Sequence, residues 1–173
     1  MIKFVPESDD ASELFKSMYY FLERYDIQKE SINAYVNRTK SVDLFLFFLT
    51  VEKLPFHDEI FEELKKQYPD YKSMSLDKRS MLFVELLLSK EHFNFGEYPK
   101  GLLPYHNYQT HITTAFAEHR VEASQYAAVN GNATLHFTIT NEHHKRIDEH
   151  YEYITKLAET KTNKSIDYSK SSK

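Results

Sequence analysis

The chain has 173 residues, a formal net charge of −4 and no cysteine, so it can bury a proper core but has no disulfide framework and no thiolate metal site. The weak negative charge argues against broad nucleic-acid binding, and with only 3 glycines there is no phosphate-binding loop and no dinucleotide fingerprint. We therefore predict no cofactor and no nucleic-acid partner. No apolar leader follows Met1 and no run reaches the ~20 residues that span a bilayer, so we expect a cytoplasmic protein without a membrane partner.

Amphipathic helices are predicted first, over residues 9–25 and more weakly over 30–37. Residues 41–55, SVDLFLFFLTVEKLP, follow as the most apolar run in the chain. Ser41 can cap a helix there and Pro55 ends the element. Leu and Phe outnumber β-branched residues in the run, which favours helix over strand, although a run that is apolar on every side has no readable period.

A second apolar helix is predicted over residues 76–90, after an amphipathic helix that Pro69 closes. Apolar residues at helical spacing usually mean burial. We therefore expect the two apolar runs, Leu44–Leu49 and Met81–Leu88, to form the core on which the other helices pack.

Residues 91–106, EHFNFGEYPKGLLPYH, show neither helical nor strand periodicity and contain two of the three glycines. Loops of this length without regular structure are uncommon and often functional, although a loop held down by its aromatic residues is the alternative. Tyr and Phe are enriched at interface hot spots. The candidate binding anchors are therefore Phe93, Phe95, Tyr98 and Tyr105.

The last third predicts a helix over 107–128, a strand over 133–140 and a helix over 141–159. An Asn-Gly pair after the first helix also suits a hairpin, but the alanines before it favour a helix. Residues 2–5 are the best strand partner for 133–140. The tail over 161–173 has little to bury, so we expect it to be mobile.

These elements predict a mainly α fold, a single-domain helical bundle of about six helices over residues 1–160 with a minor two-stranded β element. The segment 161–173 is assigned to the mobile tail. The oligomeric state is left open.

Seven of the nine histidines lie between residues 106 and 150, and histidine suits metal binding and proton transfer near neutral pH. Helical offsets place some of them on common faces with carboxylates. The resulting alternative metal set is His111, Glu118, Glu122, His143 and His150. The H-E-x-x-H motif and paired E-x-x-H motifs are absent, so we do not expect a metal as the main interpretation.

A second histidine alternative is acid–base chemistry at two His-x-Thr segments. The pairs are His111 with Thr113 and His136 with Thr138. The strand LHFTI at 135–139 resembles one motif of the two-histidine phosphoesterases, and that resemblance implies histidines acting as general acid and base. Arg146 and His150 fall one residue short of the Arg–His spacing of HEPN-type ribonucleases.

No catalytic motif has complete spacing, whereas an aromatic-rich loop is present. We therefore predict a small protein that acts by binding a protein partner, as an inhibitor, immunity factor or regulator does, and we favour this function over that of an enzyme. Its excess of lysine over arginine, with many Tyr and Phe, is typical of AT-rich coding sequences such as those of phages and other mobile elements. The alternative is a histidine-dependent hydrolase or nuclease built from residues 106–150.

Overall fold

The structure, a computed structural model, describes residues 2–6, 10–108, 112–150 and 167–172. The fold is mainly α, as predicted. Contacts divide the chain into two compact units: unit 1 is Met1–Asp10 with Tyr98–Lys173, and unit 2 is Ala11–Glu97. The prediction of one domain over residues 1–160 stays a prediction, because two compact units can belong to one domain. No described helix combines the length and apolar character needed to cross a membrane.

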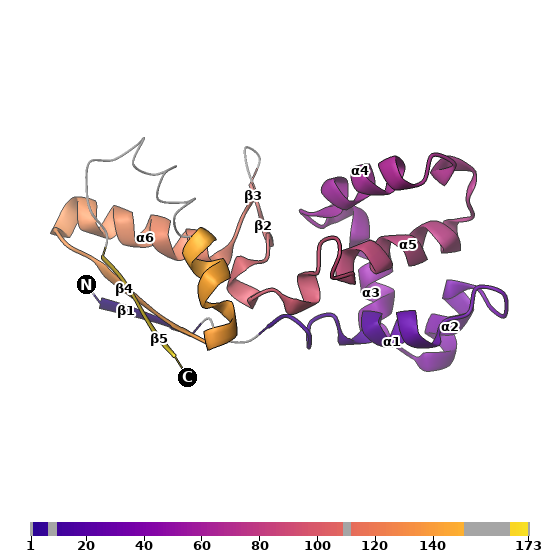
Figure 1. Cartoon of the computed structure of the whole chain (residues 1–173), viewed down its shortest axis with the longest axis horizontal. Coiled ribbons are helices and arrows are strands. Elements are labelled where there is room, and N and C mark those ends of the chain that lie inside the picture. The colour runs from indigo at the N-terminus through magenta and orange to yellow at the C-terminus, as the bar shows by residue number, and fades with distance from the viewer. Residues whose placement is uncertain (1, 7–9, 109–111, 151–166, 173) are drawn as a thin grey trace. The chain divides into compact units, whose positions relative to one another are not determined.

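Unit 2 is built from α-helices joined by short 3-10 turns. The elements are α1 (Lys16–Arg24), α2 (Ile32–Thr39), α3 (Val42–Thr50), η1 (Val51–Lys53), α4 (His57–Gln67), η2 (Tyr71–Ser73), α5 (Leu76–Leu88) and η3 (Phe95–Glu97) (Figure 1). The hydroxyl oxygens of Ser31, Ser41 and Ser75 accept backbone N–H groups three residues on, at 3.2, 3.4 and 3.2 Å. These caps satisfy donors that a helix start leaves open, so the predicted starts of α3 and α5 are confirmed.

The core of unit 2 is centred on α5, which packs against α1 and α4. Six of the seven positions from Leu82 to Leu88 are buried, the exception being Glu85. This agrees with the core predicted for Met81–Leu88, although Met81 itself is only half-buried. Aromatic rings extend this core: the ring of Phe21 lies 4.7 Å from Tyr25 and 5.5 Å from Tyr35, measured between ring centres. Such stacked and edge-on pairs add to the energy of burial.

Helix α3 is buried on one face only, so the expectation that the whole apolar run lies in the core is wrong. Leu44 is 0% exposed and Phe47 is 7% exposed. The opposite face remains in solvent, because no described element covers it. A helix that is apolar on all sides needs neighbours on all sides to be fully buried, and here the neighbours lie on one side.

Unit 1 combines a small parallel sheet with helices (Figure 1). Its elements are β1 (Ile2–Pro6), η4 (Lys100–Leu102), β2 (His106–Asn107), β3 (Ile112–Thr113), α6 (Ala115–Asn130), β4 (Thr134–Ile139), η5 (Asn141–His143), the helical residues 144–150, and β5 (Asp167–Ser172). The strand order is β1-β4-β5, and β4 runs parallel to both neighbours with Ile2 opposite Thr134. The predicted pairing of the first strand with 133–140 is confirmed.

The core of unit 1 forms where α6 packs on β4. Leu135, Phe137 and Ile139 are buried at alternate positions of β4, and the rings of Phe116 and Phe137 stack at 4.3 Å. Helix α6 ends at Gly131, whose φ of 92° suits a residue without a side chain.

Two predictions in unit 1 differ from the structure. The helix predicted over 107–128 begins only at Ala115, because Asn107 pairs with Ile112 of β3. The hydroxyl of Thr114 caps the helix and accepts the N–H of Ala117 at 3.2 Å. The predicted mobile tail contains β5, which pairs with β4. Pairing uses backbone N–H and C=O groups, so a polar segment can join a sheet edge without apolar residues.

Candidate functional site

The predicted acid–base pair stays a prediction, because only part of it falls within the described residues. His111 lies outside them. Thr113 is in β3, opposite His106. His136 and Thr138 share the half-exposed face of β4, where the ring of His136 lies 5.0 Å from that of Phe4. Of the two His-x-Thr segments of the phosphoesterase-like alternative, the structure therefore describes one in full. That segment lies on a strand, as the resemblance implies.

The carboxylates of the alternative metal set are engaged with other side chains. Glu118 accepts a hydrogen bond from the hydroxyl of Tyr108 at 3.2 Å. Glu122 forms an ion pair with Lys3 and lies 3.9 Å from Nδ1 of His119. Within the described ranges, no three His, Asp or Glu side chains gather in a way that could hold a metal ion.

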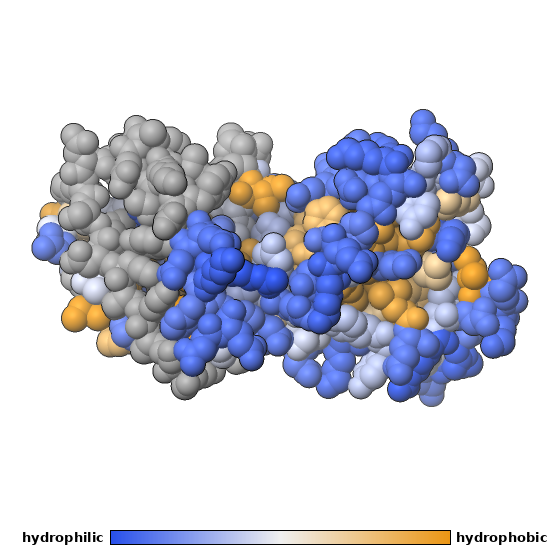
Figure 2. Space-filling model, viewed as in Figure 1, coloured by the Kyte–Doolittle hydropathy of each residue, from blue (hydrophilic) through white to orange (hydrophobic). Residues whose placement is uncertain are grey.

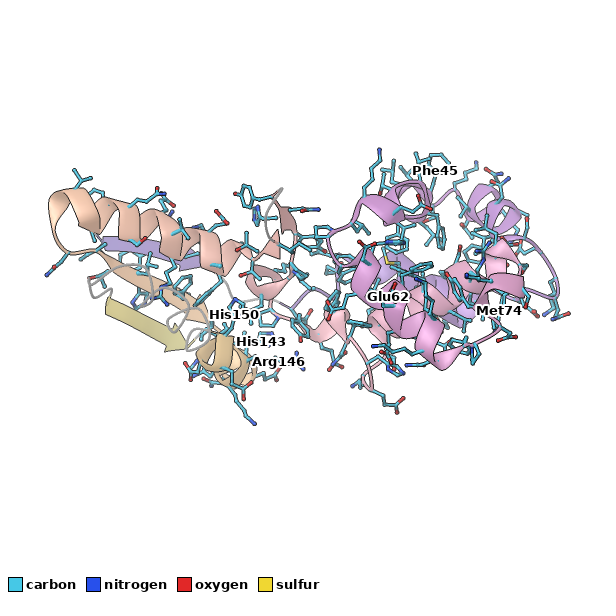
Figure 3. The ribbon with its side chains drawn as sticks, turned by 90° about the horizontal axis from the view of Figure 1, so that it is seen from above. Phe45, Glu62, Met74, His143, Arg146 and His150 are labelled. Atoms are coloured by element: carbon cyan, nitrogen blue, oxygen red, sulfur yellow. The ribbon has the colours of Figure 1, made fainter. Side chains whose placement is uncertain are left out.

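The remaining histidines of that set lie in and just before one helical segment, with Arg146 between them (Figure 3). His143 is buried, and Nε2 of His150 makes a hydrogen bond with the hydroxyl of Thr114 at 3.1 Å. Burial lowers the pKa of His150, so the neutral imidazole is favoured. Arg146 places its guanidinium 4.9 Å from the ring centre of Tyr98. These contacts suit a structural role, in which His150 supports the start of α6.

The four aromatic residues of loop 91–106 do not form one exposed set. Phe95 is 6% exposed and packs on Phe56 and Phe93, with ring centres 5.1 and 5.7 Å away. Tyr98 is half-buried, whereas Tyr105 is 41% exposed. The loop is held at Gly96, where a Cβ atom would lie 1.9 Å from the Tyr19 hydroxyl oxygen. Phe95 therefore belongs to the core of unit 2, and Tyr105 is the most exposed of the four predicted anchors.

The outer face of α3 is the exposed apolar surface that sequence reasoning missed. Its residues follow the spacing i, i+3, i+4, i+7 and form one stripe, here called the α3 stripe. Their exposed fractions are 65% for Val42, 51% for Phe45, 48% for Leu46 and 65% for Leu49. Figure 3 shows Phe45 at the outer edge of unit 2, on the side that faces away from the viewer in Figure 2.

A groove of about 500 Å³ runs beside the α3 stripe, between α2, α3 and α5. Phe45 and Leu49 belong to both the stripe and the groove. The remaining groove residues are Ile32, Asn33, Val36, Phe48, Val51, Glu52, Leu76, Asp77 and Ser80. The charged residues among them are two carboxylates, and no lysine or arginine lines the groove. Asp77 also accepts the backbone N–H of Ile32 at 3.3 Å, which ties α5 to the start of α2.

The sequence contains the signal for this surface. Between residues 42 and 50 the polar residues are Asp43 and Thr50, so a helical projection has apolar groups both on the inner face and on the stripe. Sequence alone does not say how many faces of a helix are covered, so the apolar character of the run predicts that all of it lies in the core.

The structure thus defines a mainly α protein with an exposed apolar groove in its helical unit and a small parallel sheet in the other unit. The chain belongs to the family described as Domain of unknown function (DUF4301), whose model matches residues 1–173. The match includes both units. No curated protein and no solved structure matches the chain.

Proposed function

We propose that the protein acts by binding another protein through the α3 stripe and the groove beside it. The observation that supports this proposal is the exposure of four large apolar side chains from a single helix, Val42, Phe45, Leu46 and Leu49. Single exposed apolar residues are common on proteins, but contiguous apolar patches with polar rims are typical of interaction sites. An uncovered stripe of this kind is also a liability for aggregation, which a bound partner removes.

The partner segment that this surface fits is an amphipathic helix with basic residues beside its apolar stripe. A groove between helices accepts an apolar helix face, whose anchors recur at i, i+3, i+4 and i+7. Glu52 and Asp77 supply negative charge in the groove, and no lysine or arginine opposes it there. A lysine or arginine of the partner therefore meets charge of the opposite sign in the groove. This complementarity contributes mostly to specificity and to the association rate.

Phe45 is the expected hot spot of the interface. It lines the groove, it belongs to the stripe, and it is 51% exposed, so half of its surface remains to be buried by a partner. Aromatic anchors at the centre of an interface typically lose about 2 kcal/mol or more of binding free energy on truncation, which is a factor of about 30 in Kd.

The test has two steps, both with the full chain. First, the photo-crosslinking amino acid p-benzoylphenylalanine replaces Leu46 in cells of the source organism, and mass spectrometry identifies the crosslinked segment. A parallel sample carries it in place of Val129, which is 83% exposed on α6 and lies outside the groove. Second, the segment crosslinked at position 46 is synthesised as a peptide, and its Kd is measured by fluorescence anisotropy.

We expect a segment with apolar residues at helical spacing and with lysine or arginine beside them. Phe45→Ser should raise the Kd of the peptide by about 30-fold, whereas Val129→Ser should leave this Kd unchanged. Circular dichroism checks that both variants are folded. The proposal is wrong if positions 46 and 129 crosslink the same segments, if Phe45→Ser binds the peptide normally, or if the crosslinked molecule is a second copy of this chain.

A further inference from the structure

We propose that unit 2 contains a second binding site, a pocket for a small aromatic carboxylate. This site is separate in chemistry from the groove proposed for the partner helix, although the two share the side chains of Phe48, Val51, Glu52, Leu76 and Ser80. The pocket lies between α3, α4 and α5 and has a volume of about 220 Å³. An apolar cavity of about 150 Å³ in another protein takes up benzene, so this pocket has room for one ring with a short substituent.

Aromatic side chains make up most of the pocket wall. They are Phe47, Phe48, His57, Phe61, Tyr71 and Phe83. The ring of His57 stacks between Phe61 and Phe83, with ring centres 5.5 and 5.6 Å away and interplanar angles of 17° and 23°. Phe61 also meets Tyr71 edge-on at 5.5 Å.

Each of these rings is thus already part of a stacked or edge-on series. Aromatic pairs favour offset-stacked and edge-to-face arrangements with ring centres about 4.5–7 Å apart. A ligand ring that enters the pocket can continue the series in either arrangement. An aliphatic ligand of the same size lacks the quadrupole for these contacts, so the wall favours an aromatic ligand.

Arg79 supplies the positive charge of the pocket. Its guanidinium carbon lies 5.6 Å from the ring centre of Tyr71. The Nε–H of Arg79 is buried and has no hydrogen-bond acceptor, and the guanidinium has no ion-pair partner in the described part of the chain. A buried donor without an acceptor is uncommon in native proteins, and a bound group that accepts its hydrogen bond is one explanation for it. A carboxylate fits this place because it accepts paired hydrogen bonds from the guanidinium fork.

Glu52 also lines the pocket, and its charge has the opposite sign. It is exposed, so water and salt screen its charge, whereas the buried Nε–H of Arg79 is screened much less. The pocket therefore favours an anion over a cation. Glu52 is expected to weaken anion binding slightly, and Glu52→Gln should strengthen it.

The test is isothermal titration calorimetry of the full chain with two probes of the same shape, 3-phenylpropionate and 3-phenylpropionamide. Wild-type protein should bind the carboxylate about tenfold more tightly than the amide, because a charge-assisted hydrogen bond replaces a neutral one. Arg79→Met should remove this preference by weakening the carboxylate alone, and Arg79→Lys should retain part of it. Phe45→Ser should bind both probes as the wild type does.

Several results would overturn the proposal. These are equal affinity of the wild-type chain for the two probes, no binding of either probe, or an Arg79→Met variant that keeps the preference. The probe pair tests the wild-type chain directly, so the result stands even if Arg79→Met fails to fold. The two proposals also fail independently, because the partner peptide depends on Phe45 and the probe preference depends on Arg79.

Discussion

Two phenylalanines of α3, two residues apart, allow a direct test of which face of this helix belongs to the core. Phe47 is 7% exposed, and its ring lies 5.4 Å from Phe48 and 6.4 Å from Phe83. Phe45 is 51% exposed. Each is replaced by alanine in an otherwise unchanged chain, so the two variants lose the same atoms from the same helix.

The expected losses of stability differ several-fold. Emptying a buried phenylalanine site costs about 3–5 kcal/mol, because transfer energy and packing are both lost. Phe45 buries only half of its side chain, and complete burial of a phenylalanine is worth about 1.5–3 kcal/mol, so Phe45→Ala should lose half of this, about 1 kcal/mol. Alanine is the better helix former by a few tenths of a kcal/mol, but this gain is the same in both variants and cancels in the difference.

Urea unfolding followed by circular dichroism measures the difference. With an m-value of about 2 kcal/mol/M, a loss of about 4 kcal/mol moves the midpoint down by about 2 M, whereas a loss of about 1 kcal/mol moves it by about 0.5 M. Equal midpoints for the two variants would refute the one-sided burial of α3. A larger loss for Phe45→Ala would mean that the outer face of the helix is the covered one, and the proposed interface would then be wrong.

Two further predictions concern unit 1. Burial holds the pKa of His150 below its usual range. As the pH falls below about 6.5, this histidine therefore takes up a proton in the unfolded chain but not in the folded chain. The free energy of unfolding should fall between pH 7.5 and 5.5 as a result. Thermal melts should show a smaller fall for His150→Gln, and an identical fall would mean that His150 is not the group responsible. Deleting residues 167–173 removes β5 from the edge of β4 and should lower the melting temperature by at least about 2–4 °C, the shift expected for each 1 kcal/mol lost. An unchanged melting temperature would instead support the mobile tail that the sequence predicts.

The sequence did not locate the exposed apolar surface that the structure shows on α3. The sequence predicts a surface that binds a protein through aromatic side chains, and it assigns this role to loop 91–106. The structure places Phe95 of that loop in the core against Phe56, and it leaves the stripe containing Phe45 in solvent. Both are phenylalanines, so residue type alone does not separate them. The pocket around Arg79 had no sequence signal, since its wall comes from three helices and two turns.

The sequence by itself determined the features that depend on near neighbours along the chain. The caps at Ser41 and Ser75, the end of α6 at Gly131 and the alternation along β4 involve residues a few positions apart, so their chemistry is readable locally. Tertiary structure alone decided which side of α3 is covered, that a polar segment completes the sheet as β5, and that the rings around Arg79 enclose a pocket. Each of these depends on segments that are distant in sequence, and burial is a property of the neighbours as much as of the residue itself.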